Sequence, residues 1–188
     1  MSVSGRLDSP PQIDSLSFDA AGLSASGTVT LAANGQLKKA SFGRVRSGSW
    51  LNAPVELIGR GAGRDPAVRV LGGTIDLRKT AIGAGGRSKA TGRGGPISLA
   101  LDRLQISDGI SLTDFRGEFE TARGMSGNFR GRVNGDARIT GVIVPQKGRS
   151  AFRIRSKDAG AVLRSSGILK QARGGDFELT LAPSGQKG

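Results

Sequence analysis

The sequence predicts an all-β protein, an antiparallel meander of about ten short strands with one short helix near residues 157–165. Apolar and polar residues alternate along most of the 188-residue chain, as they do in strands that bury one face. The alternating segments are joined mostly by short stretches rich in Gly, Asn and Asp, which are typical of hairpin turns. A pattern that resembles a helix interrupts this alternation at residues 155–167.

The first half of the chain supports this interpretation. In residues 23–31, the odd-numbered positions from Leu23 to Leu31 share one face of an expected strand. Asn34 and Gly35 follow, and both residue types tolerate the positive φ that a tight hairpin requires. Residues 53–59 and 67–78 are expected to form further short strands.

The second half gives a clearer pattern, with one irregularity. Residues 96–107 place apolar side chains at every second position up to Leu101, and the phase then changes to Leu104 and Ile106. A change of phase by one residue is typical of a β-bulge or a strand break. Twelve residues are expected to form one continuous apolar track: Ile97, Leu99, Leu101, Phe115, Phe119, Phe129, Val133, Ile139, Phe152, Ile154, Phe177 and Leu179.

Glycines recur between the large residues of this apolar face, at positions 27, 117, 131 and 141. A missing side chain permits strong sheet curvature or close approach of the backbone. The same gap also provides space for an apolar guest. Both interpretations remain open from sequence.

Composition restricts the chemistry that the chain can perform. It contains no His and no Cys, so the usual metal ligands, the thiol nucleophile and the commonest general base are missing. No cofactor-binding motif and no cluster of carboxylates stands out. We therefore expect a protein that is not an enzyme and that holds no metal and no cofactor.

The net charge of +13, from 28 basic and 15 acidic residues, favours an anionic partner such as phospholipid headgroups. A charged surface that serves only solubility is the alternative. Six arginines fall opposite the apolar face and are expected on the outer, solvated side, where they would attract an anionic membrane surface: Arg116, Arg130, Arg132, Arg138, Arg153 and Arg155.

Residues 83–95 form a segment rich in Gly, Arg and Lys, which we expect to be a mobile loop. The segment contains no match to the phosphate-binding loop G-x-x-x-x-G-K-[ST] and no aromatic residue on which a base would stack. Nucleic-acid binding is therefore not expected.

The helix of residues 157–165 has terminal signals of its own. Ser156 is the expected N-cap, Asp158 lies in the first turn, and Gly167 suits the C-terminal stop. A helix of about two turns is unstable alone, so its apolar side must pack on the sheet. We expect it to cover an end or an edge that the strands leave open.

The stretch of residues 129–183 resembles the C-terminal region of AsmA-like, YhdP-type envelope proteins of Gram-negative bacteria. Its most specific parts are S-x-D-A-G-x-x-L-R and G-G-x-F-x-L, and the resemblance extends more weakly over residues 67–183. The motif residues are Ser156, Asp158, Ala159, Gly160, Leu163, Arg164, Gly174, Gly175, Phe177 and Leu179.

This resemblance implies a curved, open β-groove related to the bridge-like lipid transporters that include TamB. The groove would bind phospholipid acyl chains on its apolar face and help to move phospholipid between the inner and outer membranes. Residues 1–188 would be a single β-rich segment of a larger periplasmic protein, attached to the inner membrane through a segment absent from this chain. The rest of that protein would be a partner.

The residues themselves leave a second architecture open, a closed β-sandwich or barrel. That core would suit a structural or outer-membrane assembly module without catalytic activity. The two architectures differ in their response to an arginine at Phe119 or Phe129. The substitution would displace acyl chains from an open groove, because an unpaired charge in an apolar channel costs several kcal/mol, whereas it would unfold a closed core.

Overall fold

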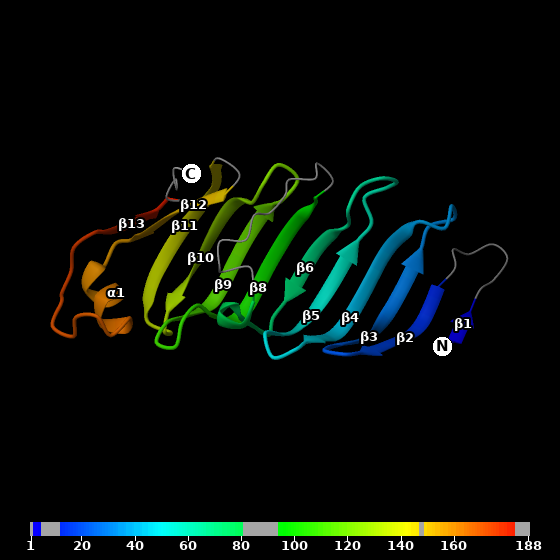
Figure 1. Cartoon of the computed structure of the whole chain (residues 1–188), viewed down its shortest axis with the longest axis horizontal. Coiled ribbons are helices and arrows are strands. Elements are labelled where there is room, and N and C mark those ends of the chain that lie inside the picture. Colours follow the sequence, from blue (N-terminus) through cyan, green and yellow to red (C-terminus); the bar gives the residue numbers. More distant parts are fainter. Residues whose placement is uncertain (1, 5–11, 81–93, 147–148, 183–188) are drawn as a thin grey trace, which may run out of the picture.

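The computed structural model describes residues 2–4, 12–80, 94–146 and 149–182, and these form a single β-sheet with two short helices (Figure 1). Neighbouring strands follow the order β1-β2-β3-β4-β5-β6-β8-β9-β10-β11-β12-β13, and β7 pairs with both β5 and β8. The strands are β1 (Ser2–Ser4), β2 (Gln12–Ala20), β3 (Leu23–Leu31), β4 (Leu37–Ser47), β5 (Leu51–Ile58), β6 (Ala67–Leu71), β7 (Thr74–Asp76), β8 (Pro96–Gln105), β9 (Ser111–Glu120), β10 (Ser126–Val133), β11 (Ala137–Gln146), β12 (Arg149–Ser156) and β13 (Phe177–Leu181). The helices are the 3₁₀-helix η1 (Leu77–Lys79) and the α-helix α1 (Ala159–Ser165).

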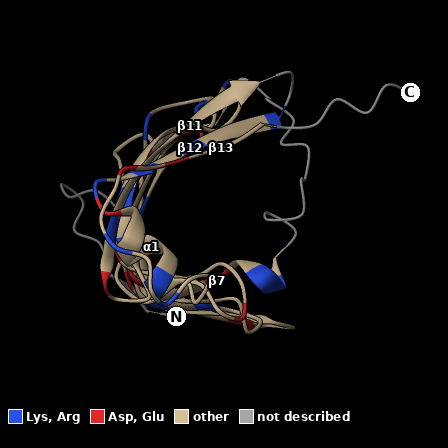
Figure 2. Ribbon diagram, turned by 90° about the vertical axis from the view of Figure 1, so that its left-hand side faces the viewer, with Lys and Arg blue, Asp and Glu red and all other residues tan. Residues whose placement is uncertain are grey.

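The sheet is curved and open. Viewed along its long axis, the strands bend into the outline of a C, with β11 to β13 in one arm and β7 in the other (Figure 2). The outermost strands β1 and β13 each pair with one neighbour only, so the sheet does not close into a barrel. The prediction of an all-β, curved, open groove is confirmed. The alternative of a closed sandwich or barrel is not what the structure shows.

The meander is interrupted once. All consecutive pairs of strands are antiparallel except at β8, which pairs in parallel with both β6 and β7. Strands β6 and β7 occupy two halves of one position between β5 and β8, separated by Gly72 and Gly73. Both glycines have positive φ, and a Cβ at Gly73 would lie 2.3 Å from the carbonyl oxygen of Asn52. The sheet is therefore mainly antiparallel, as expected, and the described strands depart from the antiparallel meander at β8, because the chain leaves the sheet after β7 and returns in the same direction.

The change of phase expected near Leu101 is present inside a continuous strand. Leu101 and Leu104 are three residues apart in β8, yet both are buried in the same cluster. The backbone irregularity is shared with β9, where Asp114 has a φ of 49° and Leu112 and Phe115 are likewise both buried. In both strands the side chains that point to the buried face thus change phase at the same place. The pairing of β8 with β9 keeps the same register on both sides of this place.

The loop expected at residues 83–95 cannot be compared with the structure over most of its length. Residues 83–93 lie outside the described residues. Gly94 and Gly95 are described and lead directly into β8.

Candidate functional site

The strand registers place the twelve predicted track residues on one face of the sheet. Directly paired residues of neighbouring strands share a face, and the pairs Ile97–Phe119 and Leu101–Phe115 connect β8 to β9 in this way. Five of the twelve are buried: Leu101, Phe115, Phe119, Val133 and Ile139. Six more are half-buried against that cluster: Ile97, Leu99, Phe129, Phe152, Ile154 and Phe177. Leu179, at the β13 edge, is 38% exposed.

This apolar face is the concave one. The sheet is a single layer, so a side chain is fully enclosed only where its neighbours close over it, as they do inside a curve. Leu101 is 0% exposed, whereas residues of the opposite face, such as Glu118 and Val142, are exposed. In the described part of the chain, no second layer covers the concave face along its length (Figures 1 and 2).

The apolar face continues well beyond the twelve predicted residues. Val68 and Val70 of β6 pair with Ile97 and Leu99, and Val55 of β5 pairs in turn with Val70. The pairing extends the face through β4 and β3 to β2 at the other end. The alternation in residues 53–59 and 67–71 was the available signal for this extension, since it marks the same strands.

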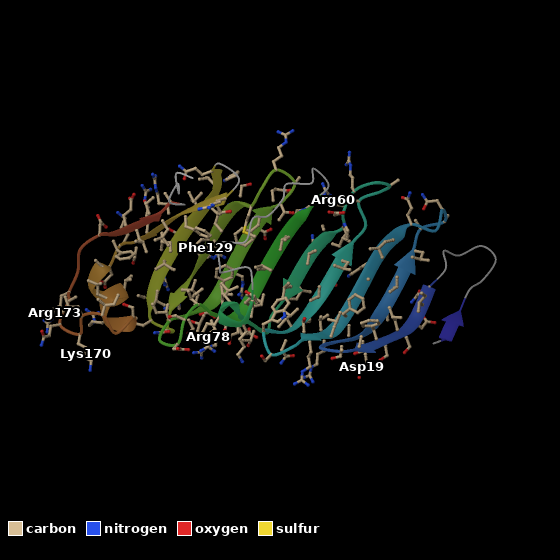
Figure 3. The ribbon with its side chains drawn as sticks, in the orientation of Figure 1. Asp19, Arg60, Arg78, Phe129, Lys170 and Arg173 are labelled. Carbon is tan, nitrogen blue, oxygen red and sulfur yellow. The ribbon has the colours of Figure 1, made fainter. Side chains whose placement is uncertain are left out.

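Phenylalanine rings fill the space beside two of the four glycines. Phe129 lies opposite Gly117 on one side and Gly141 on the other. A Cβ at Gly141 would lie 2.1 Å from the Phe129 ring, and a Cβ at Gly117 would lie 2.5 Å from the Phe119 ring. Phe115 and Phe129 stack with ring centroids 5.6 Å apart. These two glycines therefore make room for the protein's own rings on the floor of the groove; Phe129 is labelled in Figure 3.

The other two glycines act through the backbone. At Gly27, the first contact of an added Cβ would be the Ser41 carbonyl oxygen at 2.0 Å, beside a register shift between β3 and β4. At Gly131, an added Cβ would lie 3.3 Å from the Thr113 carbonyl oxygen, also beside a register shift. Close backbone approach, rather than space for a guest, accounts for both positions.

Helix α1 packs at one end of the groove, as expected. Ala161 and Val162 belong to the same buried cluster as the groove floor, and the helix packs against β11 at the end of the sheet (Figure 1). Gly167 has a φ of 75°, and its N–H donates to the Arg164 carbonyl at 3.0 Å, which ends the helix.

The N-cap assignment differs from the expectation. Asp158, not Ser156, is the N-cap of α1, and its carboxylate accepts the N–H of Ala161 at 2.8 Å. The Ser156 hydroxyl instead donates to the Arg138 carbonyl at 2.7 Å and accepts the N–H of Asp158 at 3.2 Å. β12 extends through Ser156, so this residue anchors the end of the strand and not the helix.

The structure brings the motif residues of α1 and the following loop together. The N–H groups of Ala159 and Gly160 donate to the carbonyls of Gly175 and Gly174, at 2.7 and 2.9 Å. A Cβ at Gly160 would lie 2.5 Å from the backbone of Arg173. Leu163 accepts N–H groups of the loop through its carbonyl, and the Arg164 guanidinium donates to the carbonyl of Ala172. These residues thus hold a helix and its returning loop as one unit at the end of the groove.

Asn134 fastens this unit to the sheet, and sequence reasoning missed it. It follows β10 with a φ of 49°, and its amide oxygen accepts from the backbone N–H and hydroxyl of Ser111 at 2.8 and 3.1 Å. Its amide nitrogen donates to the carbonyls of Gly109 and Ser165 at 2.8 and 2.7 Å. One side chain thereby joins two hairpin turns and the C-terminal end of α1.

The six arginines alternate with the apolar residues of their strands and lie on the convex face. Five are exposed, and Arg132 is partly buried. Arg132 pairs with Asp114 at 3.6 Å, and Arg153 and Arg155 share Glu178 at 3.5 and 2.9 Å. These ion pairs reduce the positive charge of the convex face at the β9–β13 end.

Asp76 and Arg78 fix the turn at which the chain leaves β7. The Asp76 carboxylate accepts from the Arg78 side chain at 2.6 and 2.8 Å, and these hydrogen bonds hold the pKa of Asp76 below its ordinary value. A carboxyl whose folded-state pKa is lowered stabilises the fold above its unfolded-state pKa, near 4, and this stabilisation is lost as the pH falls through the folded-state pKa.

We therefore expect Asp76→Asn to lower the thermal midpoint at neutral pH, with the gap to the wild type narrowing below about pH 4. Thermal melts between neutral and acidic pH measure this gap. Asp19→Asn, which removes an exposed carboxylate at the far end of the sheet, is the control. A difference in thermal midpoint between Asp76→Asn and the wild type that is the same at every pH would contradict the stabilising role of the ionised Asp76 carboxylate.

Among the described residues, no group of three or more acidic side chains is placed to hold a metal ion, and no helix is long and apolar enough to cross a bilayer. Comparison of the chain with family models, curated proteins and solved structures found no match.

Proposed function

We propose that the chain is a lipid-binding and lipid-conducting β-groove segment of an AsmA-like envelope protein. In this function the concave face binds phospholipid acyl chains and helps to move phospholipid between the inner and outer membranes. The segment would work in the periplasm as part of a larger protein anchored in the inner membrane. The observation that carries the proposal is the continuous apolar face, which no element of the described chain covers along its length.

The half-buried residues supply the surface that a guest would contact. Leu99, Phe152 and Ile154 pack against the buried floor but keep part of their surface exposed. An antiparallel sheet tolerates water on one face, whereas an apolar face gains stability when it is covered. An acyl chain fits this need, because each buried CH₂ contributes about 0.8 kcal/mol.

The dimensions of the sheet favour a long apolar guest. Twelve strand positions at a spacing of about 4.8 Å give a groove roughly 50 Å long. Half of a bilayer hydrocarbon core, the thickness that one acyl chain spans, is only about 15 Å. The groove thus has room for more than one chain in succession, as conduction along it would require.

The test is organic extraction of the purified protein followed by mass spectrometry, without any added lipid. We expect phospholipid in an amount comparable to that of the protein. A folded, monodisperse protein that yields no lipid would contradict the proposal and favour a structural or assembly module instead. In that case a protein partner, and not lipid, would cover the apolar face of the groove.

A further inference from the structure

The loop that connects α1 to β13 presents the most exposed large apolar side chain of the described residues. Within this tip loop (residues 167–176), Ile168 is 71% exposed and its neighbour Leu169 is 49% exposed. Isolated exposed aliphatic residues are ordinary on protein surfaces. Two consecutive ones at the extremity of an elongated molecule form a small projecting apolar point.

Three cations are close in the chain to this apolar point: Arg164 in the last turn of α1, and Lys170 and Arg173 in the tip loop. Arg164, Lys170 and Arg173 line an open hollow of about 560 Å³ between α1 and the tip loop, and Lys170 and Arg173 project at the end of the molecule (Figure 3). No ion pair involves these three in the part of the chain that the structure describes. The hollow includes one carboxylate, that of Asp158, whose oxygen caps α1 by accepting the N–H of Ala161.

The tip loop is held in place at both ends. The N–H groups of Ile168 and Leu169 donate to the carbonyl of Leu163, at 3.0 and 3.1 Å. At the other end, the carbonyls of Gly174 and Gly175 accept the first N–H groups of α1. The aliphatic side chains are therefore presented on a fixed backbone, which lowers the entropy lost when they are buried.

We propose that the tip loop docks this end of the molecule on the surface of an anionic phospholipid bilayer. Ile168 and Leu169 enter the boundary between headgroups and acyl chains, while Arg164, Lys170 and Arg173 contact lipid phosphates. Exposed aliphatic residues close in the chain to cations without an ion-pair partner among the described residues are the combination that interfacial membrane binding uses, because apolar burial and attraction to anionic lipid add together. The inference goes beyond the groove and does not depend on whether the groove carries lipid.

Sedimentation of the full chain with vesicles tests this docking. The two probes are vesicles of phosphatidylcholine alone and vesicles of phosphatidylcholine mixed with phosphatidylglycerol. We expect binding to the anionic vesicles that weakens with added salt. Equal binding to both vesicle types would overturn the proposal, and so would the absence of vesicle binding, which would favour an acidic protein as the partner.

Paired variants locate the contact. Lys170→Gln/Arg173→Gln is expected to weaken partitioning onto anionic vesicles about 30-fold, since each cation near the surface is worth about fivefold. Ile168→Ser/Leu169→Ser is expected to weaken it about tenfold. The matched controls are Arg44→Gln/Arg46→Gln, two exposed cations of β4, and Leu71→Ser, a 51% exposed leucine of β6.

Losses confined to the two tip variants support the proposal. Losses of the same size in the controls, or tip variants that bind like the wild type, overturn it. Lipid carried in the groove is measured separately, by extraction of protein that has not been incubated with vesicles. Failure of the docking proposal and failure of the proposed groove function are therefore distinguishable.

Discussion

Leu99→Arg is expected to leave the protein folded and to reduce the phospholipid extracted with it at least about tenfold. Leu99 lies on the concave face of β8 between Val70 and Gly117, and part of its surface is exposed to the groove. A long cationic side chain there reaches toward the open mouth and remains hydrated, so the fold tolerates it. An acyl chain that passes the same point would lose its apolar contacts and desolvate the charge, which costs several kcal/mol.

The matched control is Ser98→Arg, one residue away on the convex face of the same strand. It adds the same charge beside Glu118, whose carboxylate accepts from the Ser98 hydroxyl at 2.7 Å. We expect the control to fold and to retain its lipid. Mass spectrometry of extracts, with circular dichroism melts of both variants, checks the result. Equal lipid content in the two variants would contradict the proposed path of the acyl chain.

Arginine at Phe119 is expected to behave differently from arginine at Leu99. Phe119 is 7% exposed and its ring lies against Gly117 and Gly127 on the groove floor. From the sequence, arginine at this position was expected to displace lipid from an open groove and to unfold only a closed core. The structure shows that an open groove still has an enclosed floor, so Phe119→Arg is expected to unfold the protein and reports on the floor alone.

Asn134→Ala is expected to destabilise the protein by about 3–5 kcal/mol, which lowers the thermal midpoint by roughly 10 °C or more. The substitution removes four hydrogen bonds and leaves the backbone N–H of Ser111, a residue only 1% exposed, without its side-chain acceptor. It also places alanine at a φ of 49°, which favours asparagine or glycine.

Asn34→Ala is the matched control, because Asn34 also precedes a glycine in a hairpin turn. Its amide oxygen accepts a single, exposed hydrogen bond from the N–H of Gln36 at 3.1 Å. We expect a loss of about 1 kcal/mol or less there. Thermal melts of the two variants under the same conditions provide the comparison, and equal losses would show that Asn134 does not fasten the helix end to the sheet.

These two asparagines illustrate the limit of sequence reasoning. Asn34-Gly35 and Asn134-Gly135 are the same dipeptide between alternating strands, and both form hairpin turns. Local chemistry favours a turn at both places, because Asn and Gly both tolerate positive φ, although in the structure Gly35, Asn134 and Gly135 have positive φ and Asn34 does not. The role of Asn134 as a fastener depends on Gly109, Ser111 and Ser165, which only the folded sheet and helix bring to it.

The β6–β7 region and the N-cap of α1 show the same division. Sequence alternation located both short strands, but parallel pairing with β8 depends on where the chain returns to the sheet after residue 80. Both Ser156 and Asp158 are suitable caps by residue type. β12 extends through Ser156, and the Ser156 hydroxyl donates to the Arg138 carbonyl. Asp158 is therefore the residue that caps α1.

The sequence by itself determined the all-β class, the short helix at its place near the C-terminal end, and the residues of β8 to β13 that share the apolar face. Each of these follows from local alternation or from terminal signals, which act between residues close together in the chain. Only the tertiary structure decided that the sheet stays open, that Phe129 lies across Gly117 and Gly141, and that the floor is enclosed while the wall is partly exposed. These features depend on curvature and on contacts between strands, and alternation along a single strand carries no information about either.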